Sequence, residues 1–139
     1  MTSADTGSSG ATEREGRNIL VVEDEALILM SVIDMVEELG YRAIGASNAA
    51  AALAEIEGGT DFHAMITDVS LPDMPGQDLA RVARQHRDAL PVVFSTGHRL
   101  EISADLAASG PTTVLGKPYW TDQLAEAIAK VSSETCRLP

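Results

Sequence analysis

The chain is poor in cysteine and aromatic residues and has no long apolar run, and each shortage excludes something. With one cysteine, Cys136, it can form no internal disulfide, which predicts a reducing compartment, the cytoplasm. No apolar stretch approaches the roughly 20 residues that span a bilayer, and no basic segment with a following apolar core begins the chain, so we expect no membrane association and no signal peptide. Because aromatic residues are only 4% of a chain that is 45% apolar, the core must be aliphatic.

Basic residues are scarce as well. Ten Lys and Arg stand against 21 Asp and Glu, which gives a formal net charge of −11 without any basic cluster. A polyanion would be repelled by such a chain, so we expect no nucleic-acid partner. Most of the acidity is typical of a water-soluble surface, and a minority of it is available for binding a cation.

The remaining pattern predicts one domain of five strand–helix units. We expect residues 1–16 to be a disordered tail, residues 17–133 the domain, and residues 134–139 a short tail. Short apolar runs predict strands at 19–22, 42–46, 63–67, 92–94 and 112–115, and helices are predicted up to residue 39, at 49–57 with Ser47 or Asn48 as cap, at 77–86, at 101–109 and after Thr121 as cap. This alternation implies a parallel sheet with helices on both faces.

Polar residues follow four of these strands at the point where each strand ends. Glu23 and Asp24 follow the first, Asp68 closes the third, Thr96 follows the fourth and Lys117 the fifth. The carboxyl ends of parallel strands meet at one edge, where open α/β sheets bind their ligands. Each residue alone has a plain explanation as a turn former or solvated loop residue, but their joint placement favours a functional site.

The residue types at this edge suit phosphoryl chemistry. Converging carboxylates repel one another, and oxygen-only ligands suit Mg²⁺, which would relieve the repulsion. Asp68 can act as a nucleophile on phosphorus and form an aspartyl phosphate. Lys117 would then place a positive charge on the phosphoryl oxygens, and Thr96 would donate a hydroxyl hydrogen bond to them.

Four stretches resemble, in order and spacing, a response-regulator receiver domain of bacterial two-component signalling, over about residues 17–131. They are Ile19-Leu20-Val21-Val22-Glu23-Asp24-Glu25, the run from Asp68 to Gly76, Pro91-Val92-Val93-Phe94-Ser95-Thr96-Gly97, and Lys117-Pro118. The resemblance implies a flavodoxin-like (CheY-like) three-layer α/β/α sandwich with strand order 2-1-3-4-5. Asp68 would accept a phosphoryl group from a histidine kinase or histidine phosphotransfer protein.

The resemblance also implies the metal ligands. Asp24, Asp68 and the backbone carbonyl of Ser70 would bind Mg²⁺, and Glu23 would hold the ion through water. Thr96 and Lys117 would be the switch hydroxyl and the lysine of the family, with a cis peptide bond expected before Pro118.

Some positions depart from the common receiver pattern. Val114 stands where many receivers carry an aromatic residue that moves with the switch threonine. The stretch from Phe94 to His98 resembles a Phe-Ala-Thr-Gly-aromatic subgroup of stand-alone receivers, although Ser95 and His98 differ from it. Ser70 and His98 are expected to flank the attacking water and tune the lifetime of the phosphate, and an exposed loop residue is the alternative for His98.

The expected output acts in trans. Eight residues follow Val131, too few for an effector domain, so we expect the protein to work by protein binding or as a phosphate shuttle or sink. We also expect a monomer or weak homodimer that catalyses only its own phosphorylation and dephosphorylation. Leu27, Leu29, Met30 and Ile33 exceed what a core stripe needs, which indicates either a docking surface for a partner helix or a broad core contact.

Two other functions compete with this interpretation. An aspartyl-nucleophile phosphatase would place a second Asp two residues after the nucleophile, where this chain has Ser70. A non-phosphorylated scaffold is disfavoured because the whole set of site residues is present.

Overall fold

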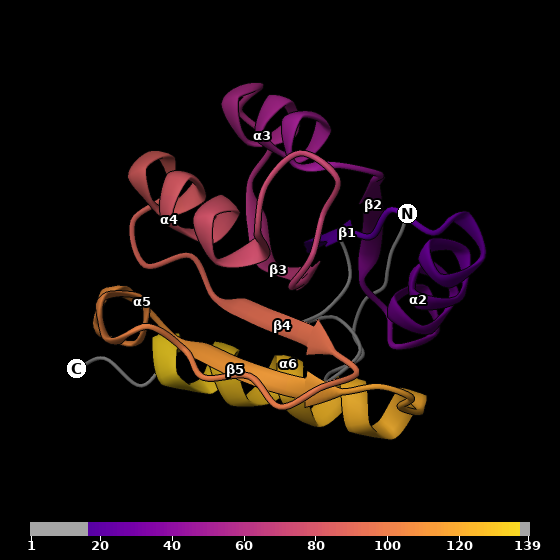
Figure 1. Ribbon diagram of the computed structural model, residues 1–139. Helices are drawn as coiled ribbons and strands as arrows, with labels where there is room; N and C mark the ends of the chain where they lie inside the picture. The colour runs from indigo at the N-terminus through magenta and orange to yellow at the C-terminus, as the bar shows by residue number, and fades with distance from the viewer. Residues whose placement is uncertain (1–16, 137–139) are drawn as a thin grey trace, which may run out of the picture.

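Short apolar β-type runs form a five-stranded parallel sheet between two layers of helices (Figure 1). The computed structural model describes residues 17–136, with side chains up to residue 132. The strands are β1 (Asn18–Val22), β2 (Arg42–Ala46), β3 (Phe62–Asp68), β4 (Val92–Thr96) and β5 (Thr112–Gly116). The helices are α2 (Ala26–Glu38), α3 (Ala49–Glu57), α4 (Gly76–His86), α5 (Ala104–Ser109) and α6 (Thr121–Cys136). The sheet order is β2-β1-β3-β4-β5, which confirms the predicted topology.

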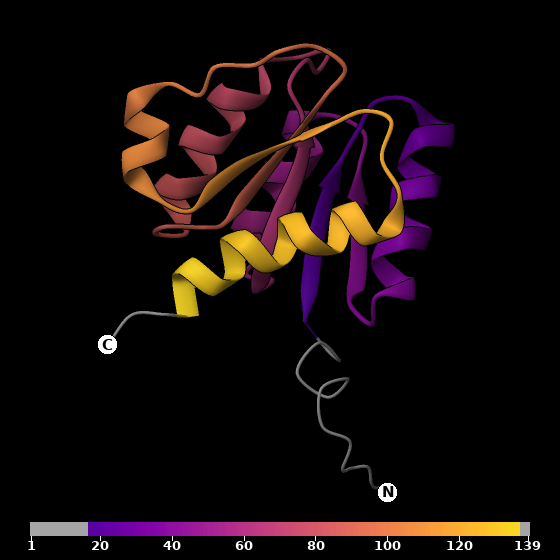
Figure 2. The same cartoon turned by 90° about the horizontal axis from the view of Figure 1, so that it is seen from below.

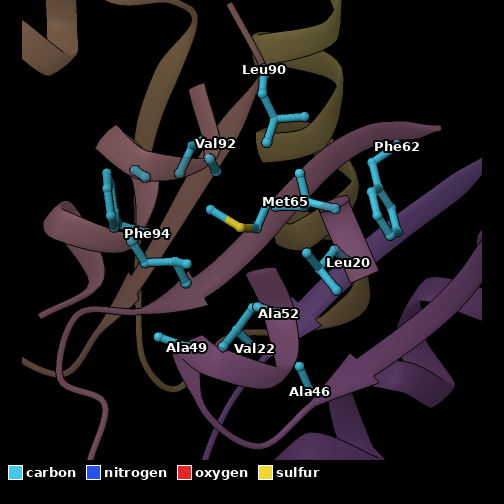
Figure 3. Close-up of a cluster of buried hydrophobic side chains, with 14 of the residues drawn as sticks. Leu20, Val22, Ala46, Ala49, Ala52, Phe62, Met65, Leu90, Val92 and Phe94 are labelled. Carbon is cyan, nitrogen blue, oxygen red and sulfur yellow. The ribbon is translucent and has the colours of Figure 1, made fainter. Parts of the chain in front are cut away.

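The two faces of the sheet carry separate cores because successive side chains of a strand point to opposite sides. Leu20 and Val22 of β1 join a cluster beneath α3, α4 and α5, part of which Figure 3 shows. Ile19 and Val21 join a second cluster beneath α2 and α6, and Figure 2 shows α6 crossing this second face with α2 beside it. The predicted flavodoxin-like three-layer sandwich is therefore correct.

The predicted helix at 101–109 is wrong in its first turn, because α5 begins only at Ala104. The backbone N–H and the hydroxyl of Ser103 both donate to Oε1 of Gln77 on α4, at 3.1 and 3.0 Å. Leu100 and Ile102 pack against the cluster beneath α3 and α4. Residues 100–103 are held by Gln77 and by these apolar contacts, and α5 begins only after Ser103.

The predicted cap of α3 is confirmed, and the predicted cap of α6 is wrong. Asn48 caps α3 by accepting a hydrogen bond from the backbone N–H of Ala51 at 2.7 Å. Thr121, predicted as a cap, is the first residue of α6. Oε1 of Gln123 instead accepts a hydrogen bond from the backbone N–H of Trp120 at 2.8 Å, so a side chain of the helix itself pairs the N–H of the residue before it.

The ends of the chain bear on the predicted boundaries. The tail predicted at 1–16 lies outside the described residues, whereas α6 continues to Cys136, past the domain end predicted at 133. Within the described part of the chain, no helix combines the length and apolar character that crossing a bilayer requires.

Candidate functional site

The carboxyl edge of the sheet brings three carboxylates and one ammonium group together. Glu23 and Asp24 follow β1, Asp68 ends β3, and each offers a carboxylate oxygen within 4.8 Å of the others. Nζ of Lys117, directly after β5, lies 3.3 Å from Oε1 of Glu23 and 3.6 Å from Oδ1 of Asp68. The structure thus assembles the acidic residues and the lysine that strand ends alone had suggested.

Acidic groups outnumber basic groups at this site. Burial raises the pKa of the Glu23 carboxyl, and the Asp68 carboxylate adds to the rise although the N–H of Glu25 and Lys117 oppose it. Burial alone would lower the pKa of the Lys117 ammonium, but Asp68 and Glu23 outweigh burial and raise it. One cation therefore faces three acidic groups, and a further positive charge would be stabilising.

The donor set fits Mg²⁺. Glu23, Asp24 and Asp68 contribute only carboxylate oxygens, which are the ligands of a hard divalent cation. Asp24 is exposed while Glu23 is buried, so an ion at this edge could keep water molecules on its outer side.

The turn after Asp68 is tightly folded against its own strand. Oδ1 of Asp68 accepts the backbone N–H of Val69 at 2.8 Å, and the N–H of Gly76 donates to the carbonyl of Val69 at 2.8 Å. A Cβ at position 76 would collide with the carbonyl oxygen of Asp68, so this position requires glycine. Ser70 is exposed in this turn, where it forms an isolated bridge to Pro75.

Thr96, the last residue of β4, is hydrogen-bonded to the loop that follows it and to the residue after β5. Its Oγ1 accepts the backbone N–H of His98 at 3.0 Å, and its carbonyl accepts the N–H of Lys117 at 2.8 Å. The His98 side chain is exposed, in keeping with the loop-residue alternative. The Lys117–Pro118 peptide bond is cis, as predicted.

The four apolar residues of α2 that exceed a core stripe differ in their surroundings. Leu29 and Ile33 lie over Gly45 of β2, where a Cβ would approach them to 3.4 and 3.0 Å. Leu27 and Met30 remain 80% and 61% exposed. Leu29 and Ile33 are therefore packing residues, and only Leu27 and Met30 remain exposed enough to contact a partner.

A groove separates α2 from the segment after β5. It has a volume of about 320 Å³, and its lining includes Leu27, Val32, Lys117 and Tyr119. Trp120 is 77% exposed in the same segment. The apolar surface of α2 therefore continues to the loop that carries Lys117.

Arg84 escaped the sequence interpretation, and Ser95 was noted only as a departure from a motif. Arg84 is buried on α4, four residues after the buried Ala80, so helical periodicity could have identified its face. Ser95 is buried beside Asp68 in the neighbouring strand. Tyr119, the residue after the Lys117-Pro118 pair, borders the groove.

Known proteins are similar to this chain in sequence and in fold. Residues 19–129 match the family described as response regulator receiver domain. The chain is 28% identical over 116 residues to the response regulator receiver protein CpdR of Brucella abortus, a match that covers 83% of this chain and 96% of CpdR. It is 29% identical over 128 residues to the transcriptional regulatory protein PdtaR of Mycobacterium tuberculosis, covering 92% of this chain and 61% of PdtaR. The sensor protein TorS of Escherichia coli is 30% identical over 91 residues, which are only 10% of its length.

The solved structures agree with these matches. A CheY-like receiver domain protein from Methanospirillum hungatei superposes with a TM-score of 0.74 and 29% identity, covering 87% of this chain and 97% of the other. A receiver protein from Sinorhizobium medicae superposes with a TM-score of 0.73 and 27% identity, covering 86% and 96%.

Proposed function

The chain belongs to the response regulator receiver domain family, and we propose that it is a phosphorylation-dependent switch that accepts a phosphoryl group on Asp68. Receiver domains interact with histidine kinases and phosphotransfer proteins, so the phosphoryl donor is a phosphohistidine on such a partner. The observation that carries the proposal is the placement of Asp68 between Lys117, at 3.6 Å, and the carboxylates of Glu23 and Asp24.

The proposed transfer uses residues at the carboxyl edge of the sheet. A carboxylate oxygen of Asp68 attacks phosphorus, the phosphorus–nitrogen bond of the phosphohistidine breaks, and the imidazole leaves with the electron pair and takes up a proton. Lys117 balances charge on the phosphoryl oxygens, and Thr96 donates its hydroxyl to them. Mg²⁺, held by Asp24, Asp68 and the carbonyl of Ser70, would neutralise the charge that gathers on the carboxylates and phosphate.

Turnover of other substrates is not part of the proposal. Hydrolysis of the aspartyl phosphate is the domain's own reaction, and Ser70 and His98 are proposed to tune its rate. A phosphatase would need an acid two residues after Asp68, and Ser70 offers only a hydroxyl. A scaffold without phosphorylation would have no use for the paired Lys117 and acidic cluster.

The output is proposed to act in trans in the cytoplasm, by protein binding or as a phosphate shuttle or sink. The support is the relation to CpdR, of which this chain spans 96%. The relation to stand-alone receivers of the Phe-Ala-Thr-Gly-aromatic type also belongs to this proposal, with Ser95 and His98 as its departures.

Phosphorylation of Asp68 is tested by mass spectrometry. The protein is incubated with Mg²⁺ and acetyl phosphate, and a phosphoryl mass increment is expected in the wild type and not in Asp68→Asn. An unmodified but folded wild type would favour the scaffold, and continuous release of phosphate would favour the phosphatase.

Partner docking is proposed on α2, over Leu27 and Met30. Asp34, Glu37 and Glu38 are exposed on the same helix, so a partner helix with an apolar stripe and basic flanks would fit. Leu27→Glu and Met30→Glu should slow transfer from a phosphohistidine protein and leave labelling by acetyl phosphate unchanged. Val114→Glu, at an exposed apolar position on β5, is the matched control. Equal loss of both reactions would show that the α2 residues support the fold.

A further inference from the structure

The first turn of α3 is capped twice, once by the residue before it and once by the loop between β3 and α4. Oδ1 of Asn48 accepts the N–H of Ala51 at 2.7 Å. The two carboxylate oxygens of Asp73 accept the N–H groups of Ala49 and Ala50, each at 2.9 Å. Asn48 alone already gives α3 the usual side-chain cap, so the second cap needs another reason.

Asp73 lies at the tip of the β3–α4 loop (residues 69–75). An isolated antiparallel bridge between Ser70 and Pro75 closes the base of this loop, and Figure 1 shows the loop reaching α3 from the end of β3. The backbone of Ser70, at the base, is therefore connected to α3 through the side chain at the tip.

A carboxylate suits this link. The N–H groups at the start of a helix carry partial positive charge, and Asp73 uses both of its oxygens on them. Asp73 is exposed, so water competes for the same hydrogen bonds and their contribution to the stability of the fold is small. The main effect of the link is therefore on the position of the loop.

A basic residue holds the opposite end of α3. Nη2 of Arg87 donates to the carbonyls of Ile56 and Thr60 at 3.0 and 2.6 Å. Arg87 directly follows α4, and the loop that contains Asp73 directly precedes it, so side chains from both flanks of α4 bind α3. Of these two side chains, only Asp73 belongs to the loop that contains Ser70.

We propose that Asp73 is a positioning residue of the magnesium site. By holding the tip of the β3–α4 loop on α3, Asp73 fixes the backbone of Ser70, whose carbonyl is one of the proposed ligands. This inference takes the magnesium site from the proposed function. Metal binding at Ser70 and the attachment of Asp73 to α3 then stabilise each other, because both favour the same conformation of the loop.

The first test is a calorimetric titration of the full chain with Mg²⁺, without a phosphoryl donor. Asp73→Ala should bind Mg²⁺ about three- to tenfold more weakly, the loss expected for one exposed hydrogen bond. Leu71 and Met74 still pack against the cluster beneath α3 in this variant, so we expect the loop to remain folded.

Two matched variants separate positioning from charge and from helix capping. Asp73→Asn removes the charge but keeps an oxygen that accepts a hydrogen bond, and it should bind Mg²⁺ within about twofold of the wild type. Arg87→Met removes the link at the other end of α3, and its affinity for Mg²⁺ should also stay within about twofold.

Amide hydrogen exchange of α3, measured by NMR, is the second readout. Saturating Mg²⁺ should slow exchange at Ala49 and Ala50 in the wild type and in Arg87→Met, by about the factor that Asp73→Ala loses in affinity, because the linkage is reciprocal. It should have no effect on these amides in Asp73→Ala. The wild-type measurement needs no substitution, so it decides the question even if a variant fails to fold.

Four results would overturn the inference. They are an unchanged Mg²⁺ affinity in Asp73→Ala, an equal loss in Arg87→Met, a loss in Asp73→Asn as large as in Asp73→Ala, and wild-type exchange at Ala49 and Ala50 that ignores Mg²⁺. In each case a wild type that still gains phosphoryl mass from acetyl phosphate leaves the proposed function intact. A wild type that binds no Mg²⁺ would overturn the magnesium site and the inference with it, and one that gains no phosphoryl mass would overturn the proposed function.

Discussion

Two largely buried cations lie at opposite edges of the sheet, and they are bonded in opposite ways. Arg84, at the amino edge, donates to the carbonyls of Leu90, Leu106 and Pro111 and to the hydroxyls of Ser109 and Thr112, at 2.7 to 3.0 Å. Lys117, at the carboxyl edge, has two long contacts to carboxylates. Burial lowers the pKa of the Arg84 guanidinium, since no carboxylate of the described chain pairs with it.

The difference separates a structural cation from a functional one. Each nitrogen of the planar Arg84 guanidinium donates to an uncharged oxygen, and these hydrogen bonds join α4 to α5 and to the start of β5. The ammonium of Lys117 is a point charge shared between competing carboxylates, so a new anion can redirect it. Short hydrogen bonds from every donor therefore mark the structural edge, and long shared contacts mark the edge at which we propose phosphoryl transfer.

The largest expected effect comes from removing the structural cation. Arg84→Met leaves several buried oxygens without a donor, and we expect a loss of about 3–5 kcal/mol in the free energy of unfolding. Urea denaturation measures it. Arg81→Met, which removes a more exposed guanidinium paired with Asp78 and Asp105, is the control and should cost far less. A loss as small as that of Arg81→Met would remove the distinction between the two edges.

Removing the functional cation should cost less stability and respond to metal. Lys117→Met leaves Glu23 and Asp68 in mutual repulsion, for which we expect a loss of about 1 kcal/mol at neutral pH. Adding Mg²⁺ should recover most of this loss, and it should not recover the loss in Arg84→Met. Thermal unfolding with and without Mg²⁺ makes the measurement, and an equal response of both variants would contradict it.

Glu23→Gln should stabilise the protein at neutral pH. The pKa of Glu23 is raised above its ordinary value of 4.5, chiefly by burial, so the folded state holds the proton more tightly than the unfolded state. Its contribution to stability is therefore present below that value and is lost as pH rises through the folded pKa. Removing the charge should add about 0.5–1 kcal/mol at pH 7 and weaken Mg²⁺ binding. Calorimetric titration with Mg²⁺ is the second readout, and undiminished affinity would argue against Glu23 as a metal-holding residue.

The smallest effect is a pH dependence at the amino edge. The ring of His63 lies between Arg17 and Ser132, with Nδ1 3.1 Å from Arg17 and Nε2 2.8 Å from Ser132 Oγ. Burial, with help from Arg17, lowers the pKa of His63 below its ordinary value of 6.5. The neutral ring is favoured in the folded state, so stability should fall as pH drops through and below that value, by less than about 1 kcal/mol.

Denaturation at pH 5.5 and 7.5 checks this last point. His63→Gln should flatten the difference without changing phosphorylation by acetyl phosphate, since His63 lies at the structural edge. A change in phosphorylation would show that the two edges are coupled.

The fold and the outline of the site could be predicted because both depend on local patterns. Continuous apolar runs ending in Asp68 and Lys117 place polar residues at one edge of any parallel sheet. Other features could not be predicted in this way. The start of α5 depends on the hydrogen bond from Ser103 to Gln77, which is distant in sequence. Which apolar residues of α2 are buried depends on Gly45, over which Leu29 and Ile33 pack.

By itself, the sequence determined the strand–helix alternation, the parallel order and which residues reach the carboxyl edge. These features depend on the position and direction of each strand, which the local apolar pattern sets. Only the tertiary structure decided that every donor of Arg84 is hydrogen-bonded and that Lys117 is shared between Glu23 and Asp68. These properties depend on contacts between elements that are distant in sequence. Whether a buried polar group is satisfied depends on where distant oxygens and donors come to lie, and no local pattern encodes that.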